Sequence, residues 1–183
     1  MSPSRRPAVA NVPPRIVLIG MRASGKTHVA AALAERLGRV CVDTDRHIAE
    51  AQGQAIADIF KSLGEPAFRE LEAAALAAAL QSPEIVISAG GGAVLREDSR
   101  ALLKAAYCIW LTAEERELAR RMAADAVSAA QRPALLGADP LVEIGALLAS
   151  RAPIYRALAR LTIATDGKTI DEIVTEILAK LPR

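Results

Sequence analysis

The chain has 183 residues, of which 23 are Lys or Arg and 21 are Asp or Glu. This length suits one α/β domain that buries its own core without disulfides or metal. Outside the first fourteen residues, which hold two arginines, basic and acidic residues balance at 21 each, so we expect no nucleic-acid partner.

The first segment, residues 1–14, is rich in Ser, Arg and Pro and predicts a disordered tail. An organelle transit peptide is the alternative, because the segment has arginines and no acids. We find no apolar run long enough for a membrane span and no hydrophobic stretch typical of a secretory signal, so we expect no membrane partner. Cys41 and Cys108 lie in separate apolar segments, which predicts buried free thiols and favours the cytoplasm.

A phosphate-binding loop follows the first apolar run, with the sequence Gly20-Met21-Arg22-Ala23-Ser24-Gly25-Lys26-Thr27. A loop of this spacing between a strand and a helix turns its backbone N–H groups inward and can hold a triphosphate. Lys26 would reach the β- and γ-phosphates, and Thr27 would supply a hydroxyl to Mg²⁺. A chance match in an ordinary loop is the alternative, which the flanking strand and helix patterns disfavour.

Short β-branched runs alternate with helical patterns along the rest of the chain, with strands expected near residues 15–19, 40–43, 85–88, 107–111 and 160–164. This alternation predicts an α/β fold with a parallel sheet covered on both faces, and we expect residues 15–183 to form one domain. Helices are expected from Lys26 to Leu37, ended by Gly38, and from Glu70 to Leu80. In such a sheet, ligands bind at the carboxyl ends of the strands.

Two acids, Asp43 and Asp45, follow the second strand. If the chain stays extended there, both carboxylates project to one side. One would hold Mg²⁺ through water and the other would accept a hydrogen bond from a substrate hydroxyl. The alternative is an acidic turn that caps the next helix. No acid follows the third strand, which makes Asp43 the stronger candidate partner of Mg²⁺.

A triple glycine, Gly90-Gly91-Gly92, follows the third strand. Because glycine costs conformational entropy, three in a row indicate that the backbone passes close to a ligand or to a neighbouring helix. A tight turn between strand and helix is an equally good interpretation.

Arginines mark three further places. Arg69 shares a helical face with Glu72 near Phe60 and Phe68, which indicates either a surface salt bridge or an arginine that binds a ligand carboxylate between aromatic walls. Arg132 lies in a weakly periodic segment, about 123–139, that is typical of a mobile lid. An arginine on a lid can neutralise the charge of a transferred phosphoryl group. The third, Arg151, lies in Arg151-Ala152-Pro153-Ile154-Tyr155.

Together these motifs resemble the shikimate kinases, relatives of the nucleoside monophosphate kinases, from about Arg15 to Leu181. The resemblance implies a three-layer fold with a five-stranded parallel sheet in the order 2-3-1-4-5, a lid, and a mobile substrate-binding region at about 44–72. It implies transfer of the γ-phosphate of ATP, with Mg²⁺, to the 3-hydroxyl of shikimate in aromatic amino acid biosynthesis. We expect a monomer.

The resemblance also implies residue roles. It assigns catalysis to Lys26, Asp45 and Arg132, and Mg²⁺ to Thr27 and Asp43. The residues expected to bind shikimate are Asp45, Phe60, Phe68, Arg69, Glu72, Gly90, Gly91, Gly92 and Arg151. Those expected to bind the nucleotide are the P-loop residues Gly20, Arg22, Ala23, Ser24, Gly25, Lys26 and Thr27, together with Arg121, Arg132 and Lys168.

Some positions depart from the family pattern. Ala23 stands where the family usually has a second P-loop glycine, which is tolerated if the residue keeps a negative φ. Arg121 matches the adenine-side arginine only loosely, Ile170 replaces a proline, and His28 replaces a small hydroxyl residue. Alternative functions are a kinase for gluconate or a nucleotide, and a sensor without catalysis. The clamp of Asp45, Arg69 and Arg151 disfavours the other kinases.

Overall fold

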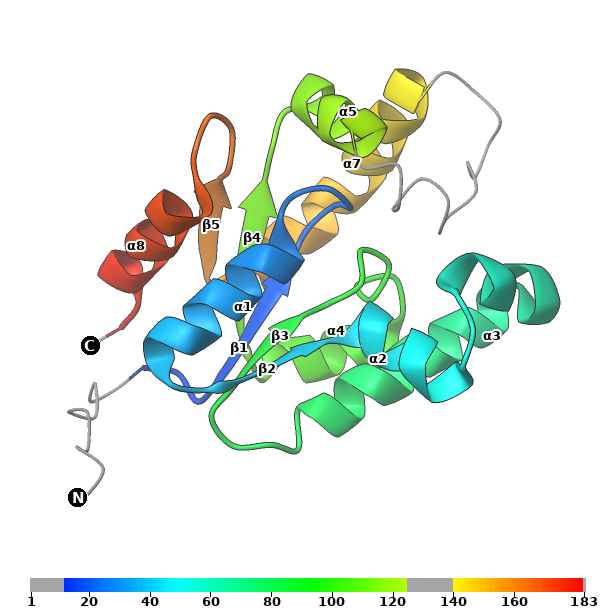
Figure 1. Cartoon of the computed structure of the whole chain (residues 1–183), viewed down its shortest axis with the longest axis horizontal. Helices are drawn as coiled ribbons and strands as arrows, with labels where there is room; N and C mark the ends of the chain where they lie inside the picture. Colours follow the sequence, from blue (N-terminus) through cyan, green and yellow to red (C-terminus); the bar gives the residue numbers. More distant parts are fainter. Residues whose placement is uncertain (1–11, 125–139, 183) are drawn as a thin grey trace.

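The computed structural model describes residues 12–124 and 140–182. Its centre is a five-stranded parallel sheet in the order β2-β3-β1-β4-β5 (Figure 1). The strands are β1 (Arg15–Ile19), β2 (Val40–Asp43), β3 (Ile85–Ser88), β4 (Tyr107–Thr112) and β5 (Leu161–Ala164). The helices are α1 (Lys26–Leu37), α2 (Thr44–Gln52), α3 (Ile56–Ala79), α4 (Glu97–Lys104), α5 (Glu115–Ala124), α7 (Pro140–Leu158) and α8 (Ile170–Lys180). The predicted fold class and strand order are confirmed.

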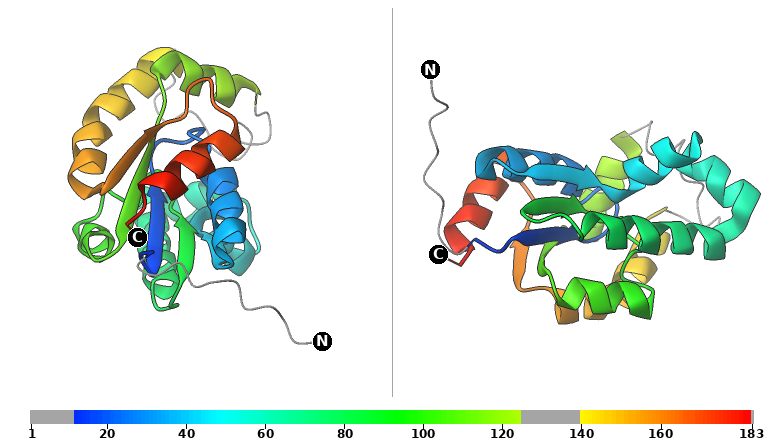
Figure 2. Two further views of the ribbon diagram at one scale, coloured as in Figure 1. Left: turned by 90° about the vertical axis from the view of Figure 1, so that its left-hand side faces the viewer. Right: turned by 90° about the horizontal axis from the view of Figure 1, so that it is seen from below.

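Helices cover both faces of the sheet (Figure 2), and the alternation of side chains along the central strand β1 explains these three layers. Val17 and Ile19 point into one apolar cluster with residues of α3, α4 and α7. Ile16 and Leu18 point into a second cluster with residues of α1 and α8. Because successive residues of a strand face opposite sides, a run of four buried apolar residues places helices on both faces of the sheet. Each fully buried aliphatic side chain contributes roughly 1.5–3 kcal/mol.

The helix expected to begin at Glu70 begins much earlier, at Ile56. Its early part was missed because Gly64 and Pro66 interrupt the helical pattern. Gly64 has φ 79° and ψ 169°, so the backbone breaks there and α3 consists of two helical segments. By contrast, α1 has the predicted ends, and Gly38 closes it in the left-handed conformation with φ 67°.

Residues 12–14, which the sequence assigned to the tail, make hydrogen bonds with the folded domain. Arg39 Nη1 donates to Pro13 O at 2.6 Å, and the N–H of Ile85 donates to Pro14 O at 2.8 Å. Residues 12–14 of the predicted tail are therefore held to the sheet, and residues 1–11 lie outside the described part.

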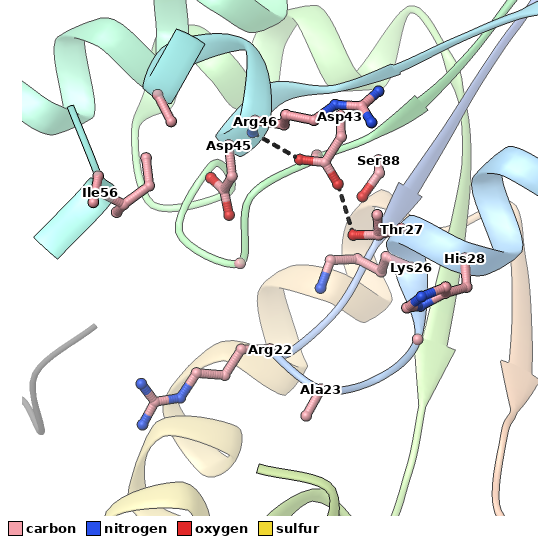
Figure 3. A pocket seen from close by; sticks show the side chains of 15 residues that line it. Arg22, Ala23, Lys26, Thr27, His28, Asp43, Asp45, Arg46, Ile56 and Ser88 are labelled. Atoms are coloured by element: carbon pink, nitrogen blue, oxygen red, sulfur yellow. Dashed lines mark hydrogen bonds between the residues drawn. The ribbon is translucent and has the colours of Figure 1, made fainter. Parts of the chain in front are cut away.

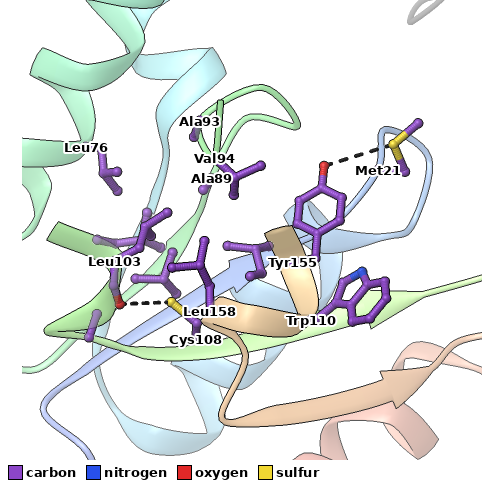
Figure 4. Packing of buried hydrophobic residues seen from close by; sticks show 14 of the residues in the cluster. Met21, Leu76, Ala89, Ala93, Val94, Leu103, Cys108, Trp110, Tyr155 and Leu158 are labelled. Atoms are coloured by element: carbon purple, nitrogen blue, oxygen red, sulfur yellow. Dashed lines mark hydrogen bonds between the residues drawn. The ribbon is translucent and has the colours of Figure 1, made fainter. Parts of the chain in front are cut away.

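The core beside the carboxyl end of the sheet is built around Tyr155 and Trp110, whose rings stack at 5.7 Å between centroids (Figure 4). Cys108 is fully buried below them, and its thiol donates to Leu103 O at 3.2 Å. Both cysteines are free, as predicted, although Cys41 is only partly buried. Within residues 12–124 and 140–182, no helix has the length and apolar character needed to cross a membrane.

Candidate active site

The loop after β1 curves around the N-terminus of α1 in backbone conformations that need glycine. Gly20 has φ 145°, and a Cβ there would lie 2.5 Å from Leu111 O. Gly25 has φ 89° and precedes the first residue of α1. Backbone N–H groups in such a curve, with the positive end of a helix dipole behind them, form a binding site for phosphate.

Ala23 adopts the left-handed conformation, with φ 62°. The condition stated for tolerance of Ala23, a negative φ, is therefore not met. The loop has the same sharp curvature that a glycine would allow, and a side chain with a Cβ pays roughly 1–2 kcal/mol for it. Arg121 Nη1 donates to Ala23 O at 3.4 Å, which ties the strained residue to α5.

Lys26 and Thr27 begin α1 at the inner side of the loop. Lys26 is buried, and its Nζ donates to Met21 O at 2.7 Å. Thr27 Oγ1 donates to Asp43 Oδ2 at 2.6 Å, and the other oxygen of Asp43 accepts the N–H of Arg46 at 3.1 Å (Figure 3). Asp43 thus caps α2, as the alternative interpretation predicted, and also contacts the P-loop, while its role toward Mg²⁺ stays a prediction.

Asp45 reaches the same cavity by a different route from the one predicted. The chain is extended only as far as Asp43, and Asp45 lies in the first turn of α2. Both acids nevertheless line one cavity, because a helical turn brings the second carboxylate round to the side of the P-loop (Figure 3).

The hydroxyl of Thr27 and the carboxylate of Asp43 fit a magnesium ion. Mg²⁺ prefers oxygen ligands, keeps several waters, and is bound through one or two protein oxygens plus substrate phosphates. Within the described residues no group of three or more His, Cys, Asp or Glu side chains gathers as a metal cage. These donors suit an ion shared with a nucleotide.

Two adjoining hollows lie at the carboxyl ends of the strands. The first, here called the P-loop cavity, has a volume of about 480 Å³ and is lined by residues that include Lys26, Thr27, Asp43 and Asp45. The second, here called the arginine pocket, has a volume of about 60 Å³ and is lined by residues that include Phe60, Phe68, Arg69, Glu72 and Arg151. Arg22 and Gly91 line both, so the two hollows meet there.

Arg69 is held on several sides in the arginine pocket. Its Nη1 donates to Glu72 Oε2 at 2.8 Å, and its Nε and Nη2 donate to Glu65 Oε1 at 3.2 and 2.7 Å. The guanidinium lies 5.9 Å from the Phe60 ring centroid and 5.5 Å from that of Phe68. Burial lowers the pKa of Arg69, but the two carboxylates outweigh it and the net pKa is raised. Because Glu72 is only 2% exposed, a surface salt bridge is the wrong description.

The triple glycine passes against these charged groups. A Cβ on Gly90 would collide with the Glu72 carboxylate and lie 2.5 Å from Asp45 Oδ1. A Cβ on Gly92 would collide with the guanidinium of Arg69. The predicted close approach therefore occurs, and the neighbours are the side chains of α2 and α3.

Gly91 joins the glycine loop to α7. Its carbonyl accepts the Tyr155 hydroxyl at 2.7 Å and Arg151 Nη1 at 3.3 Å. Tyr155 is fully buried, so this bond fixes the loop from below while Arg151 stays in the pocket. The role of Tyr155 was missed, although its i+4 spacing from Arg151 places both residues on one helical face.

Thr44 was also missed. It is fully buried between the two predicted acids. Its Oγ1 accepts the N–H of Gly90 at 3.0 Å and lies 3.4 Å from Ser88 O, so it joins α2 to the glycine loop.

A third hollow, of about 540 Å³, lies on the outer side of the P-loop between α5 and the start of α8. Arg121 lines it and donates to Thr165 Oγ1 and Thr165 O, both at 3.0 Å. Lys168 lines it too and pairs with Glu176 at 2.7 Å. Ile170 is exposed at its edge, and His28, also exposed, touches both this hollow and the P-loop cavity.

Arg132 and the lid predicted at about 123–139 fall almost entirely outside the described residues. Only positions 123 and 124 are described, and they form the last residues of α5. Arg132 therefore remains a sequence-based prediction.

Comparison with known proteins gives a consistent set of similarities. The profile of the family described as "Shikimate kinase" matches residues 22–182. The chain is 45% identical to a shikimate kinase of Symbiobacterium thermophilum, over 91% of this chain and 95% of the relative. Its structure superposes on that of "Shikimate kinase from Acinetobacter baumannii in complex with shikimate" with a TM-score of 0.85 and 32% identity, over 92% of each chain. A gluconokinase from Sinorhizobium meliloti, with a TM-score of 0.54 and 20% identity over 92% of this chain and 91% of that one, shares the fold alone.

Proposed function

Since this chain belongs to the shikimate kinase family, we propose that it transfers the γ-phosphoryl group of ATP to the 3-hydroxyl of shikimate, a step of aromatic amino acid biosynthesis. ATP is the donor and Mg²⁺ the metal cofactor. In this transfer the hydroxyl oxygen bonds to the γ-phosphorus, the bond from that phosphorus to the bridging oxygen breaks, and the hydroxyl proton leaves. The products are ADP and shikimate 3-phosphate.

One observation carries the proposal: the arginine pocket opens beside the P-loop cavity. Arg69 and Arg151, from α3 and α7, line one pocket, and Lys26 lines the hollow that meets it at Arg22 and Gly91. A small anionic polyol needs a carboxylate clamp next to the phosphoryl donor. The two guanidinium groups of the arginine pocket, which adjoins the P-loop cavity, supply such a clamp.

On the nucleotide side, Lys26 exchanges its bond to Met21 O for oxygens of the β- and γ-phosphates, and the N–H groups from Gly20 to Gly25 hold the remaining charge. Thr27 and Asp43 would hold Mg²⁺, directly and through water. When bound, the ion neutralises the charge that develops on the transferred group. Arg121 and Lys168 line the hollow proposed for the adenosine end.

On the shikimate side, Arg69 and Arg151 bind the carboxylate, with Phe60 and Phe68 as walls and Glu72 as the partner that holds Arg69. Gly90 and Gly92 leave the room that these side chains need. Asp45 orients the 3-hydroxyl toward the γ-phosphorus. Because phosphoryl transfer passes through a loose transition state, this positioning matters more than early proton removal.

A coupled assay of ADP release tests the proposal. Shikimate, gluconate and other small hydroxy acids are offered separately, and phosphorus NMR locates the phosphate on the product. We expect turnover with shikimate alone. Preference for gluconate would reject the substrate, and tight shikimate binding without turnover would favour a sensor.

The variant Asp45→Asn tests the site within the same assay. It keeps the size of the side chain but removes the charge that orients the hydroxyl. We expect it to lose most activity while ATP binding survives, and near-normal turnover would count against the role of Asp45.

We further propose a monomeric cytoplasmic enzyme with a substrate-binding region at about 44–72 and a lid at about 123–139 that carries Arg132 onto the phosphates. The free thiols support the reducing compartment. Light scattering tests the oligomeric state, and Arg132→Ala tests the lid, with a loss of kcat expected while shikimate affinity persists.

A further inference from the structure

The edge of Arg69 that a substrate carboxylate would use is covered by a side chain of the protein. Nε and Nη2 form the fork of a guanidinium that matches a carboxylate. In this structure both donate to Glu65 Oε1, at 3.2 and 2.7 Å. The third nitrogen, Nη1, is engaged by Glu72. The guanidinium of Arg69 is therefore hydrogen-bonded to two carboxylates of the protein before a substrate binds.

The two carboxylates differ in how firmly they are held. Glu72 is 2% exposed and lies against Gly90, whereas Glu65 is 52% exposed. Arg69 itself is 13% exposed, so only the carboxylate end of this i,i+4 ion pair is open to water, and water can solvate the Glu65 carboxylate after it leaves. Of the two partners, Glu65 is the one that can exchange for another anion.

The backbone at Glu65 permits this exchange. Glu65 follows Gly64, where α3 is interrupted, and precedes Pro66, which has no N–H group to donate. Glu65 therefore lies in the first turn of the second helical segment. Rotation of the side chain into solvent breaks no hydrogen bond within the helix.

We propose that Glu65 is a built-in competitor of the substrate carboxylate: it covers the Nε and Nη2 edge of Arg69 in the ligand-free protein and leaves when shikimate binds. This inference rests on the proposed function. A substrate carboxylate cannot bind the Nε and Nη2 edge of Arg69 while Glu65 stays, because both nitrogens already donate to Glu65 Oε1. Glu65 therefore sets the apparent affinity of the pocket for carboxylates.

The same competition makes the pocket selective among anions. An anion that bridges Arg69 and Arg151 gains bonds from two guanidinium groups, which compensates for the displaced Glu65. Inorganic sulfate on Arg69 alone gains no such second contact. Glu65 thus keeps small inorganic anions from occupying the site.

The test compares Glu65→Gln with a matched control, Asp58→Asn. Gln keeps the size of the side chain but binds the guanidinium more weakly. Asp58 is exposed on the first segment of the same helix and pairs with Lys61 at 3.6 Å, so its variant removes one negative charge without touching Arg69. Calorimetry measures the Kd of shikimate, and the coupled assay measures KM, kcat and inhibition by sulfate.

We expect Glu65→Gln to lower the Kd and KM of shikimate about two- to five-fold, the range set by the strength of exposed ion pairs, with kcat within about two-fold. Sulfate should inhibit this variant more strongly than the parent. Asp58→Asn should resemble the parent in all four quantities.

An unchanged or raised Kd in Glu65→Gln would overturn the proposal, because it would mean that Glu65 only holds Arg69 in place for the substrate. The proposed function fails separately. If the parent binds shikimate but does not phosphorylate it, the activity is wrong while the comparison of Kd values still decides the role of Glu65. If the parent does not bind shikimate, both the proposed function and the proposed role of Glu65 are rejected.

Discussion

Thr27 Oγ1 donates a hydrogen bond of 2.6 Å to Asp43 Oδ2, which joins the first turn of α1 to the end of β2. The two residues are 16 positions apart in the chain and come from neighbouring elements at the carboxyl edge of the sheet. The bond sets a hydroxyl and a carboxylate side by side at the P-loop. This pair is the proposed site of Mg²⁺.

Asp43→Asn tests the pair. The amide oxygen can still accept the N–H of Arg46 and cap α2, but the negative charge is lost. We expect the Mg²⁺ concentration for half-maximal activity to rise roughly ten-fold, with the melting temperature close to that of the parent. Asp43→Ala should show the same Mg²⁺ effect and in addition lose about 1 kcal/mol of stability with the cap. An unchanged Mg²⁺ dependence in both variants would remove Asp43 from the metal site.

Ala23→Gly tests the strained P-loop residue. Glycine adopts φ 62° without the steric cost of a Cβ, so the unfolding free energy should stay equal or rise by up to about 1 kcal/mol. The matched control is Ala74→Gly, at an exposed position inside α3, where the same change should cost about 0.5–1 kcal/mol. Urea unfolding of both variants measures the difference. Equal destabilisation by the two changes would show that Ala23 carries no strain.

Gly92→Ala tests the contact between the glycine loop and the carboxylate clamp. Its Cβ would displace the guanidinium of Arg69, whereas a Cβ on Gly91 meets no atom closer than 3.5 Å. We expect Gly92→Ala to raise the KM of shikimate more than ten-fold, by loss of a charged hydrogen bond, while the KM of ATP changes little. Gly91→Ala should have the smaller effect on shikimate. A larger rise in the KM of shikimate for Gly91→Ala than for Gly92→Ala would mean that the added Cβ at Gly92 moves the glycine loop and leaves the guanidinium of Arg69 in place.

Arg121→Ala tests the hollow between α5 and α8. The variant removes the bonds to Thr165 and to Ala23 O, and with them the wall proposed for the adenosine end. We expect the KM of ATP to rise roughly ten-fold, as for loss of one charged contact, with the KM of shikimate unchanged. Steady-state kinetics with each substrate varied in turn separates the two constants. A change confined to shikimate would place the nucleotide elsewhere.

Alkaline pH tests the buried core beneath the site. Burial raises the pKa of Cys108 from 9.0 to about 12 and that of Tyr155 from 10.0 to about 12. Because the unfolded chain loses these protons first, their contribution is fully present below about pH 9 and is lost as pH rises to 12. Urea unfolding at several pH values should show stability falling from pH 9. Cys108→Ala should make the fall between pH 9 and pH 10 shallower, since burial also raises the pKa of Cys41, and a flat profile in the parent would contradict the burial of Cys108 and Tyr155.

Asp43 and Asp45 show what local sequence can and cannot predict about a site. Their presence beside the P-loop could be predicted, since the carboxyl ends of parallel strands meet at one edge. The way in which Asp45 arrives could not, because whether the chain continues as strand or turns into α2 depends on the cap formed by Asp43. The prediction that both acids lie beside the P-loop is therefore correct, but the extended backbone predicted for Asp45 is wrong.

Arg69 shows the opposite limit. Its spacing from Glu72 predicted the pair, but spacing alone could not distinguish a surface bridge from a buried clamp. The distinction comes from the glycine loop of β3 and from Phe60 and Phe68, which cover the pair. The second partner, Glu65, was missed because the break at Gly64 obscures the helix that links it to Arg69.

The amino-acid order by itself determined the strands, the P-loop and the fold class, because β-branched runs, glycine spacing and helix ends are local properties with local causes. Only the tertiary structure decided that Ala23 accepts a left-handed backbone, that Tyr155 holds Gly91, and that Arg69 and Arg151 face one pocket. The last two relationships join residues far apart in the chain. They depend on how α3 and α7 pack against the sheet, and that packing is set by the whole core at once.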